Sequence, residues 1–150
     1  EDKFYSVPFD TGVTGLYVRT DILEEAGYKV DDLQDITWTE LEEIGLKVQE
    51  TTGLKTLSMD LNDLGLLRAM INGSGSWYTT EDGVTPNIAE NAALKEAFAT
   101  FKSMYEKDLV NVHSDWAQML EAFNTGVVWT VPQGNWITPS VVQAADQAGK

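Results

Sequence analysis

The sequence predicts an α/β domain, because short apolar runs with strand-like patterns alternate with amphipathic helical stretches along the whole chain. Hydrophobic residues make up 43% of the 150 residues and charged residues 23%, as in ordinary globular proteins. A chain of this length can bury a core without disulfides or structural metals. We therefore expect residues 1–150 to fold as one unit in which helices flank a sheet.

The first third of the chain contains two strand-like runs and two helical stretches. Gly27 is well placed to end the short helix, because glycine readily adopts the left-handed conformation that closes helices. Thr37 and Glu40 have the spacing of a capping box, and Gly53 marks the end of the helix behind them. The predicted elements are strands at 4–9 and 15–18, a helix at 21–26, a solvated loop at 30–36, and a helix between Thr37 and Gly53.

The remainder of the chain continues the alternation. A second capping box at residues 87–90 predicts the start of a long helix, and Ser114 can cap another that Gly126 ends. The Thr138-Pro139 pair suits the first turn of a last helix. The other predicted elements are a strand at 57–59, a helix at 62–71, a Gly- and Ser-rich loop at 72–86, a buried strand at 127–131 and a turn at 134–136.

Charge and residue usage exclude several functions. The net charge of −14 argues against binding to nucleic acid or to anionic membrane surfaces, both of which require clustered Lys and Arg. The chain has no Cys and a single His, His113, so a metal centre or a nucleophilic triad is not expected. No phosphate-cradling glycine loop is present. We therefore expect neither a cofactor nor a metal.

Three segments carry a resemblance to a known family. Residues 7–12 read Val-Pro-Phe-Asp-Thr-Gly and lead into a Tyr-containing strand and an Asp-Ile-Leu-Glu-Glu-Ala-Gly helix at 21–27. The helix from Thr37-Trp38 to Thr52-Gly53 follows, and residues 122–136 combine Ala-Phe-Asn-Thr-Gly, a strand and Gly-Asn-Trp. In order and spacing, these segments resemble the C-terminal lobe of family 1 extracellular solute-binding proteins. The resemblance covers nearly all of the chain, although Val128-Trp129 stands where the family commonly has Ala-Met.

The resemblance implies a fold, a function and partners. The fold would be one lobe of a periplasmic-binding-protein-like (type II) fold, with a small mixed sheet flanked by helices. Such proteins bind a sugar or oligosaccharide without catalysis, close two lobes around it, and deliver it to the membrane permease of an ABC importer. By this resemblance residues 1–150 are a single ligand-binding lobe, the N-terminal lobe of the same parent chain is missing, and the location is extracytoplasmic, in the periplasm or as a lipid-anchored protein.

The strongest candidate for a ligand contact is Trp136. Sugars have an apolar C–H face that stacks on aromatic rings and a rim of hydroxyls that needs fixed hydrogen-bond partners. Gly134 permits a tight turn that would leave Trp136 as a flat platform beside Asn135. Asp10 and Thr11 follow the predicted strand at 4–9 and would reach the same rim, where Asp10 could accept two sugar hydroxyls or, alternatively, only cap its own turn.

Further ligand contacts are predicted on the loop at 72–86 and at the end of another strand. Trp77 and Tyr78 lie on that loop and would form a second aromatic wall, or would serve only as loop anchors. Asp60 follows the predicted strand at 57–59, where it would face the ligand or cap the next helix. The other three tryptophans, Trp38, Trp116 and Trp129, are predicted to lie in the core.

Other functions stay open from the residues alone. The acidic charge would suit a polyamine, and a lobe of this kind could also bind an anion or a metal complex. A glycosidase would need two carboxylates at a defined separation, which a sequence cannot show, and most acids here stand in charged runs typical of solvated faces. A pure interaction domain would have no aromatic cleft. The main prediction is a non-catalytic saccharide-binding lobe.

Overall fold

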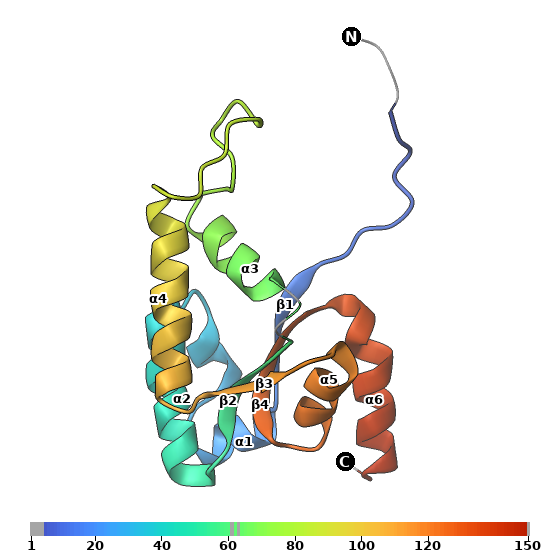
Figure 1. The fold of residues 1–150 in the computed structure, drawn as a ribbon. Coiled ribbons are helices and arrows are strands. Elements are labelled where there is room, and N and C mark those ends of the chain that lie inside the picture. Colours follow the sequence, from blue (N-terminus) through green and yellow to red (C-terminus); the bar gives the residue numbers. More distant parts are fainter. Residues whose placement is uncertain (1–4, 61, 63, 150) are drawn as a thin grey trace.

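The computed structural model describes residues 5–60, 62 and 64–149 and contains a four-stranded mixed sheet flanked by helices (Figure 1). This confirms the predicted α/β class. The elements are β1 (Thr14–Val18), α1 (Thr20–Glu25), the 3₁₀ helix η1 (Val30–Leu33), α2 (Trp38–Thr52), β2 (Lys55–Asp60), α3 (Gly65–Gly73), α4 (Ala92–Glu106), β3 (Val110–His113), α5 (Trp116–Asn124), β4 (Val128–Gly134), η2 (Asn135–Ile137) and α6 (Thr138–Gln147).

The sheet has the strand order β1-β4-β2-β3. Strands β2, β3 and β4 run parallel, whereas β1 is antiparallel to β4, with Thr14 opposite Gly134 and Val18 opposite Thr130. The helices α1 to α4 lie on one side of the sheet, and α5 and α6 lie on the other (Figure 1). The carboxyl ends of the three parallel strands lie at the same edge of the sheet, so a site built from these ends lies at that edge.

The core consists of three groups of buried side chains that meet on the sheet. The first packs α3 and α4 on β2 around Leu57 and Met104, and the second packs α5 on β4 around Val131. The third joins α1 and α2 to β4 through Leu23 and Trp129, which are both 0% exposed. Apolar burial of this kind supplies the main stabilisation of the fold, and it fixes the strand ends in place.

Local signals in the sequence explain several helix boundaries. The Thr37 hydroxyl accepts a hydrogen bond from the Glu40 amide, and the Thr37 amide donates to the Glu40 carboxylate, so the predicted capping box forms. The bonds to Thr37 hold the pKa of Glu40 below its ordinary value. At the other end of α2, Gly53 adopts φ 75°, the left-handed conformation expected for a terminating glycine.

Four predictions about elements are wrong. Residues 5–9 of the expected strand at 4–9 are exposed chain rather than a strand. The bonds to the end of the sheet begin only further along the chain, at Val13, and Phe4 lies outside the described residues. The helix predicted to start at 87–90 begins instead at Ala92, since the side-chain oxygen of the buried Asn91 accepts from the Leu94 amide and caps the helix there. Asp115 rather than Ser114 caps α5. Residues 30–33 form a short 3₁₀ helix rather than a loop.

One ion pair joins the two long helices. Glu42 of α2 is only 7% exposed, and its carboxylate accepts hydrogen bonds from the Lys107 ammonium and, at 3.2 Å, from the Ser103 hydroxyl. A carboxylate in such surroundings needs its partners, because removing one of them leaves a poorly solvated charge.

Replacing Lys107 by Met is therefore expected to lower the free energy of unfolding by about 1–3 kcal/mol. The loss is not larger because the lysine is half exposed, so water screens the ion pair. Urea denaturation measures the change. Lys102→Met is the matched control, because Lys102 pairs with Glu106 on the open surface of the same helix and should contribute less than about 0.5 kcal/mol. Equal losses from both variants would contradict the assignment.

Candidate functional site

The parallel strands β2, β3 and β4 end at one edge of the sheet, the upper edge in Figure 1, where β1 begins. Asp60 ends β2 beside His113 at the end of β3, and Gly134 ends β4 opposite Thr14 at the start of β1. Several side chains predicted to contact a ligand therefore gather around this edge, which is where open α/β sheets bind their ligands.

Trp136 stands at this edge as an exposed ring held against the backbone. It follows β4 in the short helix η2, and 57% of its surface is exposed. A Cβ atom added to Gly134 would lie 2.0 Å from the ring, and one added to Gly12 would lie 3.1 Å from it. Two glycines therefore leave room for one face of the indole to lie on the main chain, and the rest of the ring remains accessible to a ligand.

Asn135 fastens the segment that precedes β1 to the turn after β4. Its amide N–H donates to the Val13 carbonyl at 3.0 Å, and its side-chain oxygen accepts from the Val13 amide at 3.3 Å. This places Gly12 beside Trp136. Asp10 and Thr11 come next along the exposed segment, where the Asp10 carboxylate accepts from the amide of the adjacent Thr11 at 2.7 Å. This contact joins neighbouring residues and does not close a turn.

A pocket of about 280 Å³ adjoins Trp136. One side consists of the ends of β1 and β4, including Thr14, Pro132 and Gly134, and the other consists of α3, including Arg68 and Asn72. The pocket thus combines an aromatic ring with donors and acceptors on the opposite side. That combination suits a ligand with an apolar face and a polar rim.

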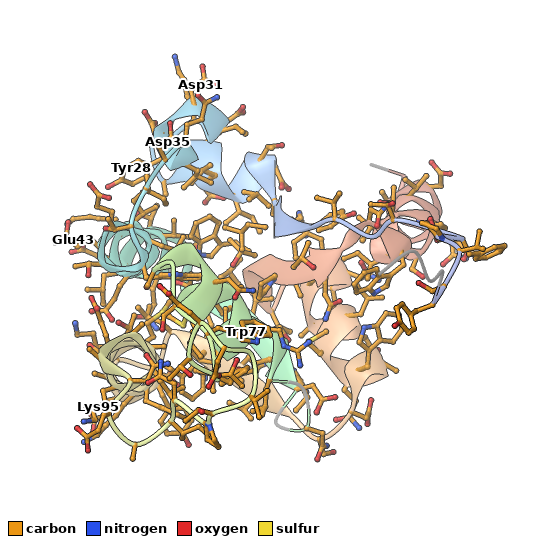
Figure 2. All side chains as sticks on the ribbon, turned by 90° about the horizontal axis from the view of Figure 1, so that it is seen from above. Tyr28, Asp31, Asp35, Glu43, Trp77 and Lys95 are labelled. Atoms are coloured by element: carbon orange, nitrogen blue, oxygen red, sulfur yellow. The ribbon has the colours of Figure 1, made fainter. Side chains whose placement is uncertain are left out.

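Trp77 and Tyr78 form an aromatic pair on the loop between α3 and α4. Their ring centroids are 5.1 Å apart, and Trp77 is 44% exposed whereas Tyr78 packs partly on the core. The buried Asn91 side chain donates to the Trp77 carbonyl at 2.9 Å and thereby holds this part of the loop. Seen from above, Trp77 lies toward the middle of the molecule (Figure 2). Neither ring is among the described residues that line the pocket beside Trp136.

Asp60 is nearly buried at the end of β2, with 8% of its surface exposed. Its carboxylate accepts from the amide and the side chain of Asn62, at 2.8 and 3.2 Å, so it organises the turn after the strand. It does not cap α3, because the N-cap position of that helix is Leu64. The capping alternative for Asp60 is wrong, because the turn separates the strand from the helix.

Three side chains near this edge are not among the ligand contacts that the sequence predicts. Trp116 was expected in the core, but it is 41% exposed at the start of α5, directly after β3. Arg68 and Asn72 line the pocket from α3. The sequence does indicate that Arg68 and Asn72 share one face, because they are four residues apart and a helix places such positions on the same side.

The loop that carries Trp77 is closed by a turn around Asp82. Its carboxylate accepts from the hydroxyl and amide of Thr85, from the Val84 amide and from the Thr80 hydroxyl, and these bonds hold the pKa of Asp82 well below its ordinary value. A depressed pKa means that the ionised form stabilises the turn. This stabilisation is complete above the ordinary carboxyl pKa and is lost as the pH falls through the folded value.

Asp82→Ala is therefore expected to raise hydrogen–deuterium exchange at Val84 and Thr85 at neutral pH, whereas wild-type protection should persist down to about pH 4. Glu81→Ala is the control, because that neighbouring carboxylate makes none of these bonds among the described residues. Exchange that is unchanged in Asp82→Ala would show that the turn does not depend on the carboxylate.

Fold and edge together define the class: one lobe of a periplasmic-binding-protein-like, type II fold. The family model for bacterial extracellular solute-binding proteins matches residues 1–150, and the chain belongs to that family. It is 45% identical over 150 residues to a lactose-binding protein of Rhizobium radiobacter. The match includes all of this chain and 35% of that relative, so the chain spans about a third of its length.

Solved structures share the fold. The GacH receptor of Streptomyces glaucescens, whose structures include a complex with acarbose, aligns with a TM-score of 0.78 at 21% identity over 92% of this chain and 35% of that one. The ABC transporter-associated binding protein of Bifidobacterium animalis subsp. lactis Bl-04 in complex with β-1,6-galactobiose gives 0.73 at 21% identity over 95% and 36%. None of the helices in the described part of the chain is long and apolar enough to cross a membrane.

Proposed function

We propose that residues 1–150 are one half of an extracytoplasmic clamp that binds a saccharide without chemical change and delivers it to the permease of an ABC importer. The observation that carries the proposal is the exposed ring of Trp136, held on Gly134 beside a pocket with a polar far side. The lactose-binding relative supports a galactose-containing ligand in particular.

The mechanism follows from the geometry of a single lobe. Stacking on Trp136 desolvates one face of a sugar ring, but the opposite face stays in water unless another surface covers it. A second lobe that closes about a hinge supplies this cover, and the closed form differs from the open form in shape. We infer that the N-terminal lobe of the same parent chain provides it and that the permease recognises the closed form.

The chain's other candidate contacts have different proposed roles. Asn135 supports Trp136 through the bonds to Val13, so its proposed role is to position the platform as much as to touch the ligand. Asp10 and Thr11 extend from the same place and are proposed to meet the ligand together with the second lobe. Trp77 and Tyr78 are proposed as outer contacts, for a ligand longer than one sugar. Asp60 is nearly buried, so its proposed contact with the ligand is limited to the end of β2.

Titration of the complete protein with lactose, galactobiose and single sugars, followed by tryptophan fluorescence, tests the proposal. We expect a saturable change at micromolar concentrations with at least one saccharide, and little change with the 150-residue chain alone, which lacks the enclosing half. Spermidine and a chromogenic galactoside complete the panel. Binding of spermidine alone, or cleavage of the galactoside, would replace saccharide capture by another function.

A further inference from the structure

The helix α3 turns one polar face toward the pocket beside Trp136. Leu67, Met70 and Ile71 bury the other side of α3 in the core, whereas Arg68 and Asn72 are exposed and both line that pocket. The two polar side chains are one helical turn apart, so they lie next to each other on the same face of α3.

Arg68 is unusual in the charge pattern of this protein. Six of the eight Lys and Arg side chains in the described residues form ion pairs with carboxylates, and the chain's other arginine, Arg19, pairs with Asp21 at 2.6 Å. The Arg68 guanidinium has neither an ion pair nor a hydrogen bond within the described part of the chain, although the sequence holds 24 acidic residues.

Stability of the helix gives no reason for an arginine at this place. Arg68 is the fourth residue of α3, near the positive end of the helix dipole, where a cation is disfavoured. Because its side chain is exposed, Arg68 also buries little apolar surface that could stabilise the fold. The guanidinium carries five N–H donors in a planar fork that matches two adjacent oxygen atoms, and none of these donors binds another of the described residues.

We propose that Arg68, assisted by Asn72, is the polar wall of the saccharide site whose apolar platform is Trp136. Arg68 donates two parallel hydrogen bonds to a pair of adjacent oxygen atoms on the sugar unit that stacks on the ring. This rests on the proposed function and deepens it, because it names a residue that selects among sugars. The oxygen pair is either two neighbouring hydroxyls of a neutral sugar or the carboxylate of an acidic one.

Isothermal titration of the complete protein with lactose and with digalacturonate, as neutral and acidic probes, tests this role. Arg68→Gln keeps an amide but removes the fork and the charge, and we expect its Kd to rise about 10- to 100-fold for the probe that the wild type binds. Arg68→Lys keeps the charge without the fork and should recover little of the loss. Asn72→Ala should weaken binding less, by about 3- to 10-fold.

Lys95→Gln is the matched control, since it removes one positive charge from the outer surface of α4, away from Trp77 in Figure 2. A selective loss with lactose identifies the hydroxyl pair, and a selective loss with digalacturonate identifies the carboxylate; both support the assignment. If Arg68→Gln binds as tightly as Lys95→Gln, the role of Arg68 is overturned while saccharide binding stands. If the wild type binds no saccharide of the wider panel, the proposed function itself fails.

Discussion

Trp136→Ala is expected to weaken saccharide binding by the complete protein about 30-fold or more, equivalent to roughly 2 kcal/mol. The indole is the large exposed aromatic surface at the pocket, and its ring cannot be replaced by neighbours because the residues beneath it are glycines. A truncation at the centre of a binding site loses both the stacking and the buried apolar area. Isothermal titration with the tightest saccharide of the panel measures the loss.

Gly134→Ala tests the same platform while leaving Trp136 in the chain. The added methyl group would meet the ring at 2.0 Å, so the indole must swing away from its place on the backbone. Binding should then fall nearly as far as in Trp136→Ala. Phe98→Ala removes a comparably exposed aromatic ring from α4 and should leave binding unchanged. If both Trp136→Ala and Gly134→Ala bound the saccharide with full affinity, the proposed contact between the ligand and the Trp136 ring would be wrong.

The framework of the fold could be predicted because its signals are local. The capping box at Thr37, the left-handed glycine at Gly53 and the apolar run of β4 depend on neighbours in sequence, and the structure has each of them. Strand β3 (Val110–His113) was not predicted, since its four residues alternate apolar and polar side chains over too short a run to be distinguished from a loop. The short strand is defined by its pairing with β2.

The site was harder to predict than the fold, because contacts across the edge join distant parts of the chain. Sequence reasoning placed Trp136 on a tight turn, but the support from Gly12 depends on Asn135 binding Val13 across the sheet end. Arg68 was missed for a similar reason. Nothing near it in sequence shows that its guanidinium lacks a partner, and only the packing of α3 brings it to the pocket.

Trp129 is the buried side chain whose loss should cost the most stability. It lies in β4, is 0% exposed, and packs against α1 and α2. Trp129→Ala is expected to lower the free energy of unfolding by about 3–5 kcal/mol, because it removes a large apolar contact and leaves a cavity between the sheet and both helices. Urea denaturation of the purified variants measures this.

The indole nitrogen makes Trp129→Phe an informative companion. Its N–H group is buried without a hydrogen-bond partner among the described residues, and an unmet donor of this kind costs about 1–3 kcal/mol. Phenylalanine retains most of the apolar contact and removes the unmet donor, so the two effects oppose each other. We expect Trp129→Phe to unfold within about 1 kcal/mol of the wild type. A loss as large as that of the alanine variant would mean that the N–H group is satisfied in solution, and that the position requires tryptophan rather than an aromatic ring.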